Sequence, residues 1–375
     1  MPGQCGFTPW VGHHECFLPE NDLICCEAPM TDFISTADII PTDCPTALCP
    51  NRMQVHSIVQ ETPDVWSLRL INHDFYPYLP GQYALVSIRN SDETLRAYTL
   101  SSTPGLSPFI QLTVRCLADG EGSNWLTQQV NAGDYLWLSE AQGEFTCAHA
   151  DDDHYLMLAA GCGVTPVMSM CRDLLARRTQ ADIRVIFNVR SPADVIFADE
   201  WQQLLQHYPQ QLQLTLVAES AATEGFIAGR ITAQIMQQVA PDITRRRVMT
   251  CGPAPYMDWV EHYCREQSVP ADHFQKEQFR TADDVIDTSN ELTMTISHPL
   301  RSVKVPVGTS LLFALEQHKV PVMAACRAGV CGSCKTRILH GEYTTSSTMT
   351  LTPEEIAQGY VLACSCQLQG DVQLA

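Results

Sequence analysis

Residues 326–334 read Cys-Arg-Ala-Gly-Val-Cys-Gly-Ser-Cys, and Cys364 follows after 29 further residues. Thiolates are soft, anionic ligands that satisfy ferric iron, and a [2Fe–2S] cluster needs four of them. Three cysteines within such a short stretch require a loop that wraps around the cluster, and Gly329 and Gly332 permit the necessary backbone turns. A structural zinc site usually pairs two Cys-x2-Cys units, whereas this region has one. The spacing therefore predicts a [2Fe–2S] cluster.

The predicted cluster ligands are the four cysteines of this pattern, Cys326, Cys331, Cys334 and Cys364. Cys366 lies two residues beyond Cys364, in an apparent strand with the sequence VLACSC. Side chains two apart on a strand share a face and lie ~6–7 Å from each other, so both thiols could point toward the iron. The residues alone leave the fourth ligand open between them.

Upstream of the cysteine loop the character of the sequence changes from domain to domain. Six short β-rich runs, separated by Pro and Gly turns, occupy residues 53–140 and predict a small antiparallel barrel. From Tyr155 to about Gly252, strand and helix patterns alternate, which predicts a parallel, doubly wound sheet. The polar, acidic stretch 281–290 is predicted to be a linker. Beyond it, a hairpin and a helix are expected before the cysteine loop.

Composition limits the functions that this chain of 375 residues can have. At ~150 residues per domain, the length suggests two or three domains. The formal net charge of −19 disfavours nucleic acid and anionic lipid as partners, and no apolar run approaches the ~18–20 residues of a membrane span. The N-terminus lacks the basic and apolar stretches of a secretory signal, so we expect a cytoplasmic protein. Seventeen cysteines without such a signal indicate reduced thiols and metal ligation.

A predicted strand leads into two glycines and a helix at residues 158–166, Leu-Ala-Ala-Gly-Cys-Gly-Val-Thr-Pro. Glycines let backbone amides approach a pyrophosphate, and the positive end of the helix stabilises its charge. Many strand-to-helix turns need glycine for geometry alone, so this motif is weak in isolation. A second motif, Thr-Cys-Gly-Pro at residues 250–253, lies where open α/β folds bind ligands. The candidate nucleotide-binding residues are Gly161, Gly163, Thr165, Pro166, Cys251, Gly252 and Pro253.

Two motifs in the barrel region carry groups that suit phosphate. Residues 96–102 read Arg-Ala-Tyr-Thr-Leu-Ser-Ser, and an arginine can bind a pyrophosphate bidentately. Strand alternation places Arg96 and Tyr98 on one face and Thr99 on the other. Residues 120–123, Gly-Glu-Gly-Ser, read as a turn that caps a helix and could hold phosphate oxygens, although most such caps are structural. The candidates here are Arg96, Tyr98, Thr99, Gly120, Gly122 and Ser123.

Taken in this order, the motifs resemble one family: ferredoxin–NADP reductase-type flavoproteins fused to a C-terminal plant-type ferredoxin. The resemblance implies a multidomain chain, with an antiparallel Greek-key β-barrel that binds FAD, a doubly wound α/β nucleotide domain, and an α+β ferredoxin domain of the β-grasp type. The expected boundaries are 1–51 for a Cys-rich irregular leader, 52–151 for the barrel, 152–280 for the nucleotide domain, 281–290 for the linker and 291–375 for the ferredoxin domain.

The resemblance also implies roles for single residues. Thr99 would hydrogen-bond near flavin N5, Tyr98 would pack on the flavin ring, and Cys251 would lie beside the nicotinamide. Phe279 matches an aromatic residue that shields the flavin, with plain packing between domains as the alternative. The register of the family selects Cys364 as the fourth cluster ligand.

Longer stretches are similar to one branch of this family, the NADH oxidoreductases that reduce the hybrid cluster protein. Examples are GCGVTPVMSM at residues 161–170 and ACRAGVCGSCKT at residues 325–336. The reaction implied by this resemblance moves electrons from NADH to FAD, then to the [2Fe–2S] cluster, and on to a protein acceptor, expected to be the hybrid cluster protein. A flavin can connect NADH to the cluster because it takes up a hydride and passes on single electrons.

The choice of nucleotide is less clear from the residues. The tip of the second strand, residues 188–191, reads Asn-Val-Arg-Ser and carries no acid for a ribose diol. Arg190 could instead contact a 2′-phosphate. The resemblance nevertheless implies NADH, with NADPH as the lesser candidate.

Two other functions remain open at this point. The reductase component of a multicomponent oxygenase would share all three domains. A thiol- or metal-sensing protein would use the cysteines and histidines of the leader: Cys5, Cys16, Cys25, Cys26, Cys44, Cys49, His13 and His14.

Overall fold

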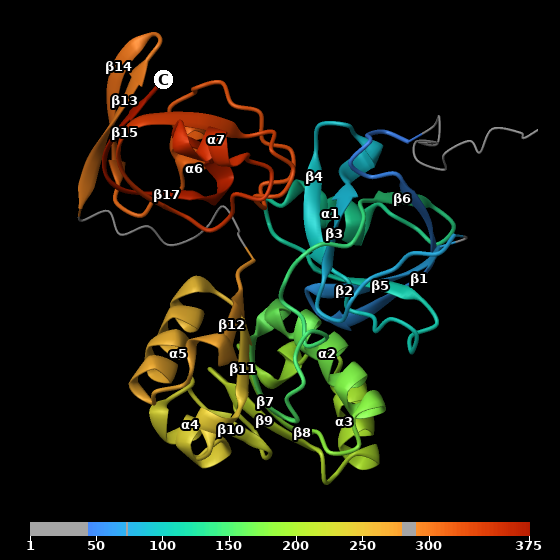
Figure 1. The fold of residues 1–375 in the computed structure, drawn as a ribbon. Helices are drawn as coiled ribbons and strands as arrows, with labels where there is room; N and C mark the ends of the chain where they lie inside the picture. The colour runs from blue at the N-terminus through green and yellow to red at the C-terminus, as the bar shows by residue number, and fades with distance from the viewer. Residues whose placement is uncertain (1–43, 73, 280–289) are drawn as a thin grey trace, which may run out of the picture. The chain divides into compact units, whose positions relative to one another are not determined.

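The computed structural model describes residues 44–72, 74–279 and 290–375, and three domains follow one another along this part of the chain (Figure 1). Most of the expected leader and nearly all of the expected linker therefore lie outside the described residues, among them Cys5, Cys16, Cys25, Cys26, His13 and His14. Within the described residues, no helix combines the length and the apolar character needed to cross a membrane.

The first domain is a six-stranded antiparallel barrel with the strand order β4-β3-β6-β1-β2-β5. A bridge between Leu100 and Leu112 joins the two ends of this order and closes the sheet. Side chains alternate between interior and exterior, so Met53 and Leu68 are fully buried. All six predicted strands are confirmed: β1 (Asn51–Thr62), β2 (Val65–Asn72), β3 (Tyr83–Ser87), β4 (Leu95–Thr99), β5 (Ile110–Arg115) and β6 (Tyr135–Leu138).

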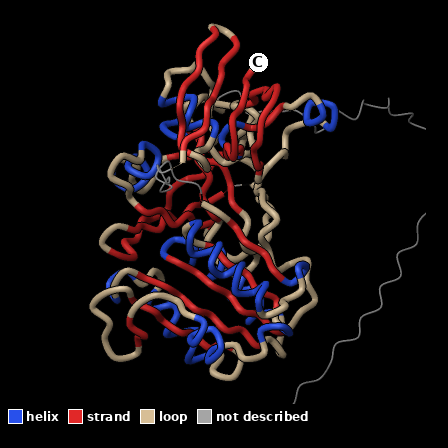
Figure 2. Tube along the Cα trace, turned by 90° about the vertical axis from the view of Figure 1, so that its left-hand side faces the viewer, coloured by secondary structure: helices blue, strands red, loops and turns tan. Residues whose placement is uncertain are grey.

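The second domain is a parallel sheet with helices on both faces, as the alternating pattern predicts (Figures 1 and 2). Its strands are β7 (His154–Ala160), β8 (Asp182–Val189), β9 (Leu212–Ala218), β10 (Phe226–Ala228), β11 (Arg247–Cys251) and β12 (Phe274–Glu277). The strand order β10-β9-β8-β7-β11-β12 changes direction between β7 and β11. Open sheets of this kind bind ligands beyond the carboxyl ends of their strands at such a switch point.

Two helices cover each face of this sheet. On one face lie α2 (Val164–Arg177) and α3 (Ala198–His207), and on the other α4 (Ala233–Val239) and α5 (Ala254–Glu266). The sequence pattern did not indicate β10, β12 or α5. The two strands have three and four residues, which is too short for a period to be recognised.

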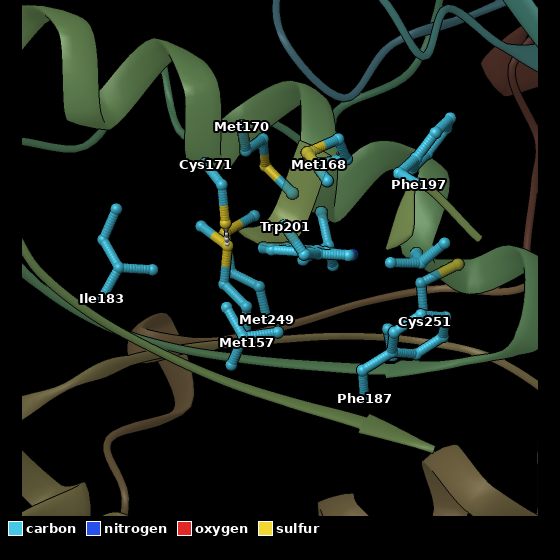
Figure 3. Packing of buried hydrophobic residues seen from close by; sticks show 14 of the residues in the cluster. Met157, Met168, Met170, Cys171, Ile183, Phe187, Phe197, Trp201, Met249 and Cys251 are labelled. Carbon is cyan, nitrogen blue, oxygen red and sulfur yellow. Dashed lines mark hydrogen bonds between the residues drawn. The ribbon is translucent and has the colours of Figure 1, made fainter. Parts of the chain in front are cut away.

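Sulfur-containing side chains fill the space between α2 and the sheet (Figure 3). Cys171 on α2 points toward Met157 on β7, with its thiol 3.5 Å from the Met157 sulfur, whereas the sulfur of the neighbouring Met170 lies 3.3 Å from the place of a Cβ atom on Gly81. All three sulfur-containing residues are fully buried. Polarisable sulfur atoms adapt to irregular gaps, so this packing joins the middle of α2 to the middle of β7.

The C-terminal domain is a mixed sheet with the order β14-β13-β17-β15-β16. β13 and β14 form the expected hairpin, β13 and β17 run parallel, and the predicted helix packs on the sheet through Leu311, Leu312 and Leu315. The elements are β13 (Glu291–Ser297), β14 (Leu300–Pro306), α6 (Leu311–Gln317), β15 (Lys335–Thr345), α7 (Pro353–Ala357), β16 (Tyr360–Leu362) and β17 (Cys366–Leu374).

The expectation of one strand through Cys364 and Cys366 is wrong. β16 ends at Leu362, residues Ala363–Ser365 form a single 3-10 turn, and β17 begins at Cys366. The reason is local hydrogen bonding, because the Cys366 amide donates back to the Ala363 carbonyl and the Ser365 hydroxyl donates to the Leu362 carbonyl at 3.0 Å. Strand alternation therefore does not relate the two thiols.

Candidate functional site

The four predicted cluster cysteines come together at one end of the C-terminal domain. The Sγ atoms of Cys334 and Cys364 lie 3.3 Å apart. The thiols of Cys331 and Cys364 donate hydrogen bonds to Cys326 and lower its pKa, and a hydrogen bond from Cys364 likewise lowers the pKa of Cys334. The four sulfurs thus form one connected group, as expected for the thiolate ligands of a single cluster.

Backbone amides point at the same sulfur atoms. The Gly329 amide donates to Cys364 Sγ at 3.1 Å, the Ala328 amide to Cys326 Sγ at 3.4 Å, and the Cys364 amide to Cys334 Sγ at 3.5 Å. Such bonds stabilise the thiolate form that an iron–sulfur cluster requires. No group of three or more His, Cys, Asp or Glu side chains is arranged around a single metal ion in the part of the chain that the structure describes.

A second loop, residues 346–351, packs over the cysteine loop. Gly329 and Gly332 have positive φ angles of 77° and 78°. A Cβ atom on Gly329 would lie 2.9 Å from Ser347 Cβ, and one on Gly332 would lie 2.9 Å from Thr350 Oγ1. The Ser347 hydroxyl also donates to the Gly329 carbonyl at 2.6 Å. Both glycines are needed for conformation and for space, and the sequence did not indicate this second loop.

Cys366 occupies a different environment from Cys364. Both residues are buried in the core of the domain, but Cys366 begins β17 and pairs with Thr345 across the sheet. Cys364 instead contacts the other predicted ligands from its turn. The geometry favours Cys364 as the fourth ligand.

The barrel motif and the glycine motif, predicted separately, face each other. Helix α1 (Glu121–Gln128) follows Gly120, and a Cβ atom on Gly122 would lie 2.9 Å from Arg96 Cγ and 3.1 Å from Tyr98 Oη. Thr99 is buried, and its Oγ1 has no hydrogen-bond partner among the described residues. Buried hydroxyl groups normally have a hydrogen-bond partner, so the end of β4 around Thr99 has room for a polar group of a ligand such as a flavin.

The expected phosphate role of the Ser123 hydroxyl is not supported. This hydroxyl donates to the Gly120 carbonyl at 3.1 Å and accepts a bond from the Leu117 amide at 3.2 Å. Ser123 therefore closes its own turn, because it lies inside the helix and not before it. The first-turn amides of α1 are the groups that an anion would meet.

The nucleotide motifs meet at the switch point of the parallel sheet. Gly161 has a positive φ of 55°, and a Cβ atom on Gly163 would lie only 2.0 Å from the Cys251 carbonyl oxygen. The turn after β7 and the end of β11 are thus in backbone contact. Gly252 is less confined, since its Cβ would lie 3.0 Å from Ala160 Cβ.

The other residues of these motifs support the turns. The Thr165 hydroxyl donates to the Cys162 carbonyl at 2.9 Å. Pro166 lies in the first turn of α2, and Pro253 precedes α5. Phe279 is partly buried and packs against the core of the α/β domain.

Glu277 is a candidate functional residue that the sequence interpretation missed. It pairs with Cys251 in the register of β11 and β12, and its Oε2 is buried with no hydrogen-bond partner among the described residues. Burial raises the pKa of Glu277 to about 8. Burial, with Glu277 next in importance, also raises the pKa of Cys251 well above its usual range. An acid two positions before Phe279 was the available signal.

Residues 188–191 carry no acid, but two acidic side chains from outside this stretch reach the tip of β8. The Arg190 Nη2 atom donates to Asp64 Oδ2 at 2.7 Å and to Asp194 Oδ1 at 2.6 Å. Asp194 follows four residues later, and Asp64 comes from the barrel. No local pattern indicates Asp64, because it is 126 residues from Arg190.

The end of the leader is packed. Cys49 is fully buried with Leu85, Trp137 and Val330 in a small cluster that also includes Cys326, and β1 begins at Asn51. Burial raises the pKa of Cys49 to about 12, with Cys44 contributing. Cys49 is therefore an unreactive thiol at neutral pH.

Comparison with known families agrees with this architecture. Residues 53–147 match the oxidoreductase FAD-binding domain, residues 157–262 the oxidoreductase NAD-binding domain, and residues 295–369 the 2Fe-2S iron-sulfur cluster binding domain. Together the three domains define an electron-transfer oxidoreductase with FAD and a [2Fe–2S] cluster as cofactors.

The chain belongs to the family of the NADH oxidoreductase HCR of Escherichia coli (strain K12). The two are 62% identical over 331 residues, which cover 88% of this chain and 99% of that relative. The glycine betaine monooxygenase reductase subunit of Chromohalobacter salexigens is 28% identical over 332 residues, 82% of this chain and 90% of its own. The expected family, NADH dependence and cofactors are thereby confirmed.

Solved structures confirm the expected fold. Phthalate dioxygenase reductase matches with a TM-score of 0.57 and 22% identity, over 86% of this chain and 97% of that one. A type IV self-sufficient cytochrome P450 monooxygenase matches with a TM-score of 0.56 and 20% identity, over 86% of this chain and 40% of that one.

Proposed function

We propose that this enzyme delivers electrons from NADH to a separate redox protein, the hybrid cluster protein, and that it does so in the cytoplasm. The relation to the E. coli NADH oxidoreductase HCR supports the branch of the family. One structural observation supports the direction of transfer: the flavin motif contacts the cysteine loop. The Leu95 amide and the Arg96 guanidinium both donate to the Ala325 carbonyl, each at 3.1 Å, and Ala325 directly precedes Cys326.

FAD supplies the chemistry that joins a two-electron donor to a one-electron cluster. In this proposal Arg96 and the first-turn amides of α1 bind its phosphates, Tyr98 packs on its ring, and Thr99 Oγ1 hydrogen-bonds to it. Phe279 covers the same region from the α/β domain.

The nucleotide is held by the turn of Gly161 and Gly163, where backbone amides at the start of α2 meet its pyrophosphate. Cys251 and Gly252 approach it from the end of β11. Glu277, with a pKa of about 8, keeps its proton at neutral pH and can donate a hydrogen bond from this buried edge.

The four thiols of Cys326, Cys331, Cys334 and Cys364 hold the cluster, and the amides of Ala328 and Gly329 stabilise their charge. The ferredoxin domain has as many basic as acidic residues between positions 291 and 375. Stand-alone ferredoxins use a strong charge to find their reductase, whereas a tethered one is kept at a high effective concentration.

The acceptor is tested by anaerobic reduction with NADH and catalytic amounts of the purified holoenzyme. We expect reduction of the hybrid cluster protein, read at its own absorption, and no comparable reduction of an oxygenase component. An oxygenase component is included as the second acceptor because one relative, 28% identical, is a monooxygenase reductase subunit. Faster reduction of the oxygenase component would overturn the choice of acceptor. Cys364→Ser is the matched control, because the transfer should then stop after the flavin.

Cys49, the buried cysteine in the described part of the leader, does not support the sensor alternative. Cys49 is buried with a raised pKa, and a thiol sensor needs an accessible thiolate.

A further inference from the structure

We propose that Asp64, a residue of the barrel, makes this enzyme select NADH over NADPH by neutralising Arg190 at the ribose end of the nucleotide site. The inference rests on the nucleotide site proposed above. It assigns a specificity role to a side chain that lies outside the nucleotide-binding domain.

Arg190 lies where dinucleotide-binding folds read the adenosine ribose. It directly follows β8, the strand next to β7 in the sheet, and the tip of this second strand contacts the ribose 2′ position in such folds. The nucleotide turn is close by, because Arg115 Nη1 lies 3.1 Å from the place of a Cβ atom on Gly161. Arg115 in turn contacts Asp64. These contacts link the Gly161 turn, Arg115, Asp64 and Arg190 in one continuous chain.

Asp64 joins both arginines through one oxygen atom. Its Oδ2 accepts the bond from Arg190 at 2.7 Å and lies 3.3 Å from Arg115 Nε. Its Oδ1 accepts a bond from the Thr62 hydroxyl at 3.0 Å, within the turn between β1 and β2. The Thr62 bond orients the carboxylate so that Oδ2 faces the arginines.

Asp194 adds the second negative charge from the α/β domain itself. It accepts the other bond from Arg190 at 2.6 Å, while its Oδ2 accepts bonds from the Ser191 amide at 3.0 Å and the Ser191 hydroxyl at 2.7 Å. Asp194 is therefore part of the local turn. Asp64 reaches the same arginine from another domain, so its removal leaves that turn intact.

This arrangement balances two guanidinium groups with two carboxylates. A 2′-phosphate binds best to an arginine whose charge is not already neutralised, since recognition of phosphate by arginine depends on charge as well as on bidentate geometry. Both carboxylates bond to Arg190 Nη2, so a phosphate that approached the same guanidinium would lie next to two negative charges. The uncharged 2′-hydroxyl of NADH meets no such penalty, and a carboxylate can accept its proton in a hydrogen bond.

The test uses the oxidised, FAD-loaded full chain and two fragments of the nucleotides, 2′,5′-ADP and 5′-AMP. Their dissociation constants are measured by isothermal titration calorimetry, which does not depend on turnover. Asp64→Asn retains an oxygen for the Thr62 hydroxyl and removes the charge that faces Arg190. We expect the ratio of affinities to shift toward 2′,5′-ADP by about tenfold, the equivalent of one charge-assisted hydrogen bond.

Two further variants separate the proposed cause from general electrostatics. Asp92→Asn removes an equal charge from an exposed position of the barrel and should leave the ratio unchanged. Arg190→Ala combined with Asp64→Asn should abolish the shift, because the freed arginine is then absent.

A ratio within about twofold of wild type in Asp64→Asn, with normal FAD content, would overturn the inference. An equal shift in Asp92→Asn would also overturn it, because net charge would then be the cause. These failures differ from failure of the proposed site: a wild-type protein that binds neither fragment, or whose flavin NADH does not reduce, contradicts the nucleotide site itself.

Discussion

The guanidinium of Arg96 donates a hydrogen bond of 3.1 Å to the carbonyl oxygen of Ala325, across 229 positions of the sequence. Arg96 belongs to the flavin motif of the barrel, and Ala325 directly precedes the first cluster cysteine. Burial lowers the pKa of Arg96, with Arg327 contributing, but an arginine remains charged at neutral pH. One side chain of the proposed flavin site thus also bonds to the loop that carries the predicted cluster cysteines.

Replacement of Arg96 by lysine tests the flavin half of this contact. Lysine keeps the charge and loses the planar, bidentate donor set, so we expect FAD affinity to fall about tenfold. Recovery of flavin fluorescence on dilution measures the dissociation constant. Arg89→Lys is the control, because Arg89 lies near α1 and pairs with exposed Glu121 at 3.4 Å. Unchanged FAD affinity in Arg96→Lys would contradict the assignment of Arg96 to the flavin site.

Thr99 carries a buried hydroxyl for which the described residues offer no partner. Thr99→Ala should slow reduction of the flavin by NADH about tenfold, because one hydrogen bond of ~1–1.5 kcal/mol is lost. Thr99→Ser restores the hydroxyl and should recover most of the rate. Stopped-flow bleaching of the flavin under anaerobic conditions gives both rates. Equal rates for the alanine and serine variants would show that the hydroxyl takes no part.

The two neighbouring cysteines, Cys364 and Cys366, are expected to differ sharply. Cys364→Ser should lose the electron paramagnetic resonance signal of the reduced cluster and the reduction of protein acceptors. It should keep NADH-driven reduction of an artificial dye, which takes electrons from the flavin. Cys366→Ser should keep the signal and lose ~1–3 kcal/mol of stability, because a more polar hydroxyl replaces a fully buried sulfur.

The double variant at Cys364 and Cys366 provides the control for these two. A labile cluster in Cys364→Ser that disappears in the double variant would mean that Cys366 can move to the vacated position. Loss of the signal in Cys366→Ser, together with its retention in Cys364→Ser, would reverse the ligand assignment.

Gly163 tolerates no side chain, because a Cβ atom would lie 2.0 Å from the Cys251 carbonyl. Gly163→Ala should destabilise the protein by about 3 kcal/mol and weaken binding of 5′-AMP, since the turn after β7 must move. Thermal unfolding and calorimetry measure the two effects. Gly370→Ala is the matched control, since its Cβ would lie 3.3 Å from Glu342 Cβ, and it should change stability by no more than ~0.5 kcal/mol. Similar stability for both variants would argue against the close approach.

Glu277 should make stability depend on pH. Burial raises its pKa from 4.5 to about 8 in the folded state, so the unfolded chain releases this proton first as the pH rises. The folded state therefore loses stability progressively between pH 4.5 and about 8 and changes no further above that range.

Glu277→Gln removes this dependence. Relative to wild type, the variant should gain stability between pH 5 and pH 8, by about 2 kcal/mol or more. Thermal unfolding of both proteins at a series of pH values measures the difference. A difference that is constant over this range would mean that Glu277 ionises normally in the folded protein.

Much of this protein could be predicted because the relevant signals are local. The six strands of the barrel follow from side-chain alternation, which a strand imposes every two residues. The cysteine spacing limits the loop at Cys326–Cys334 to a shape that encloses a small cluster. Gly161, Gly163 and Gly329 mark turns. At these positions other residues would adopt the backbone angles poorly or would find no space for a side chain. These features depend on neighbours in the chain, so the sequence contains them.

Other features depend on where distant segments meet. Ser123 turned out to close its own turn, Cys364 to leave the strand, and Cys49 to be buried, each because of a hydrogen bond or packing partner that the pattern did not specify. Glu277 acquires its raised pKa from the surroundings that bury it.

The tip of β8 shows the difference most clearly. The sequence determined that an arginine stands at this tip, and a free arginine there would favour NADPH. Only the tertiary structure places the carboxylate of Asp64 within 2.7 Å of Arg190. The charge of a site is the sum over all groups within a few ångströms, and an interaction between charges depends on distance in space and not on separation along the chain.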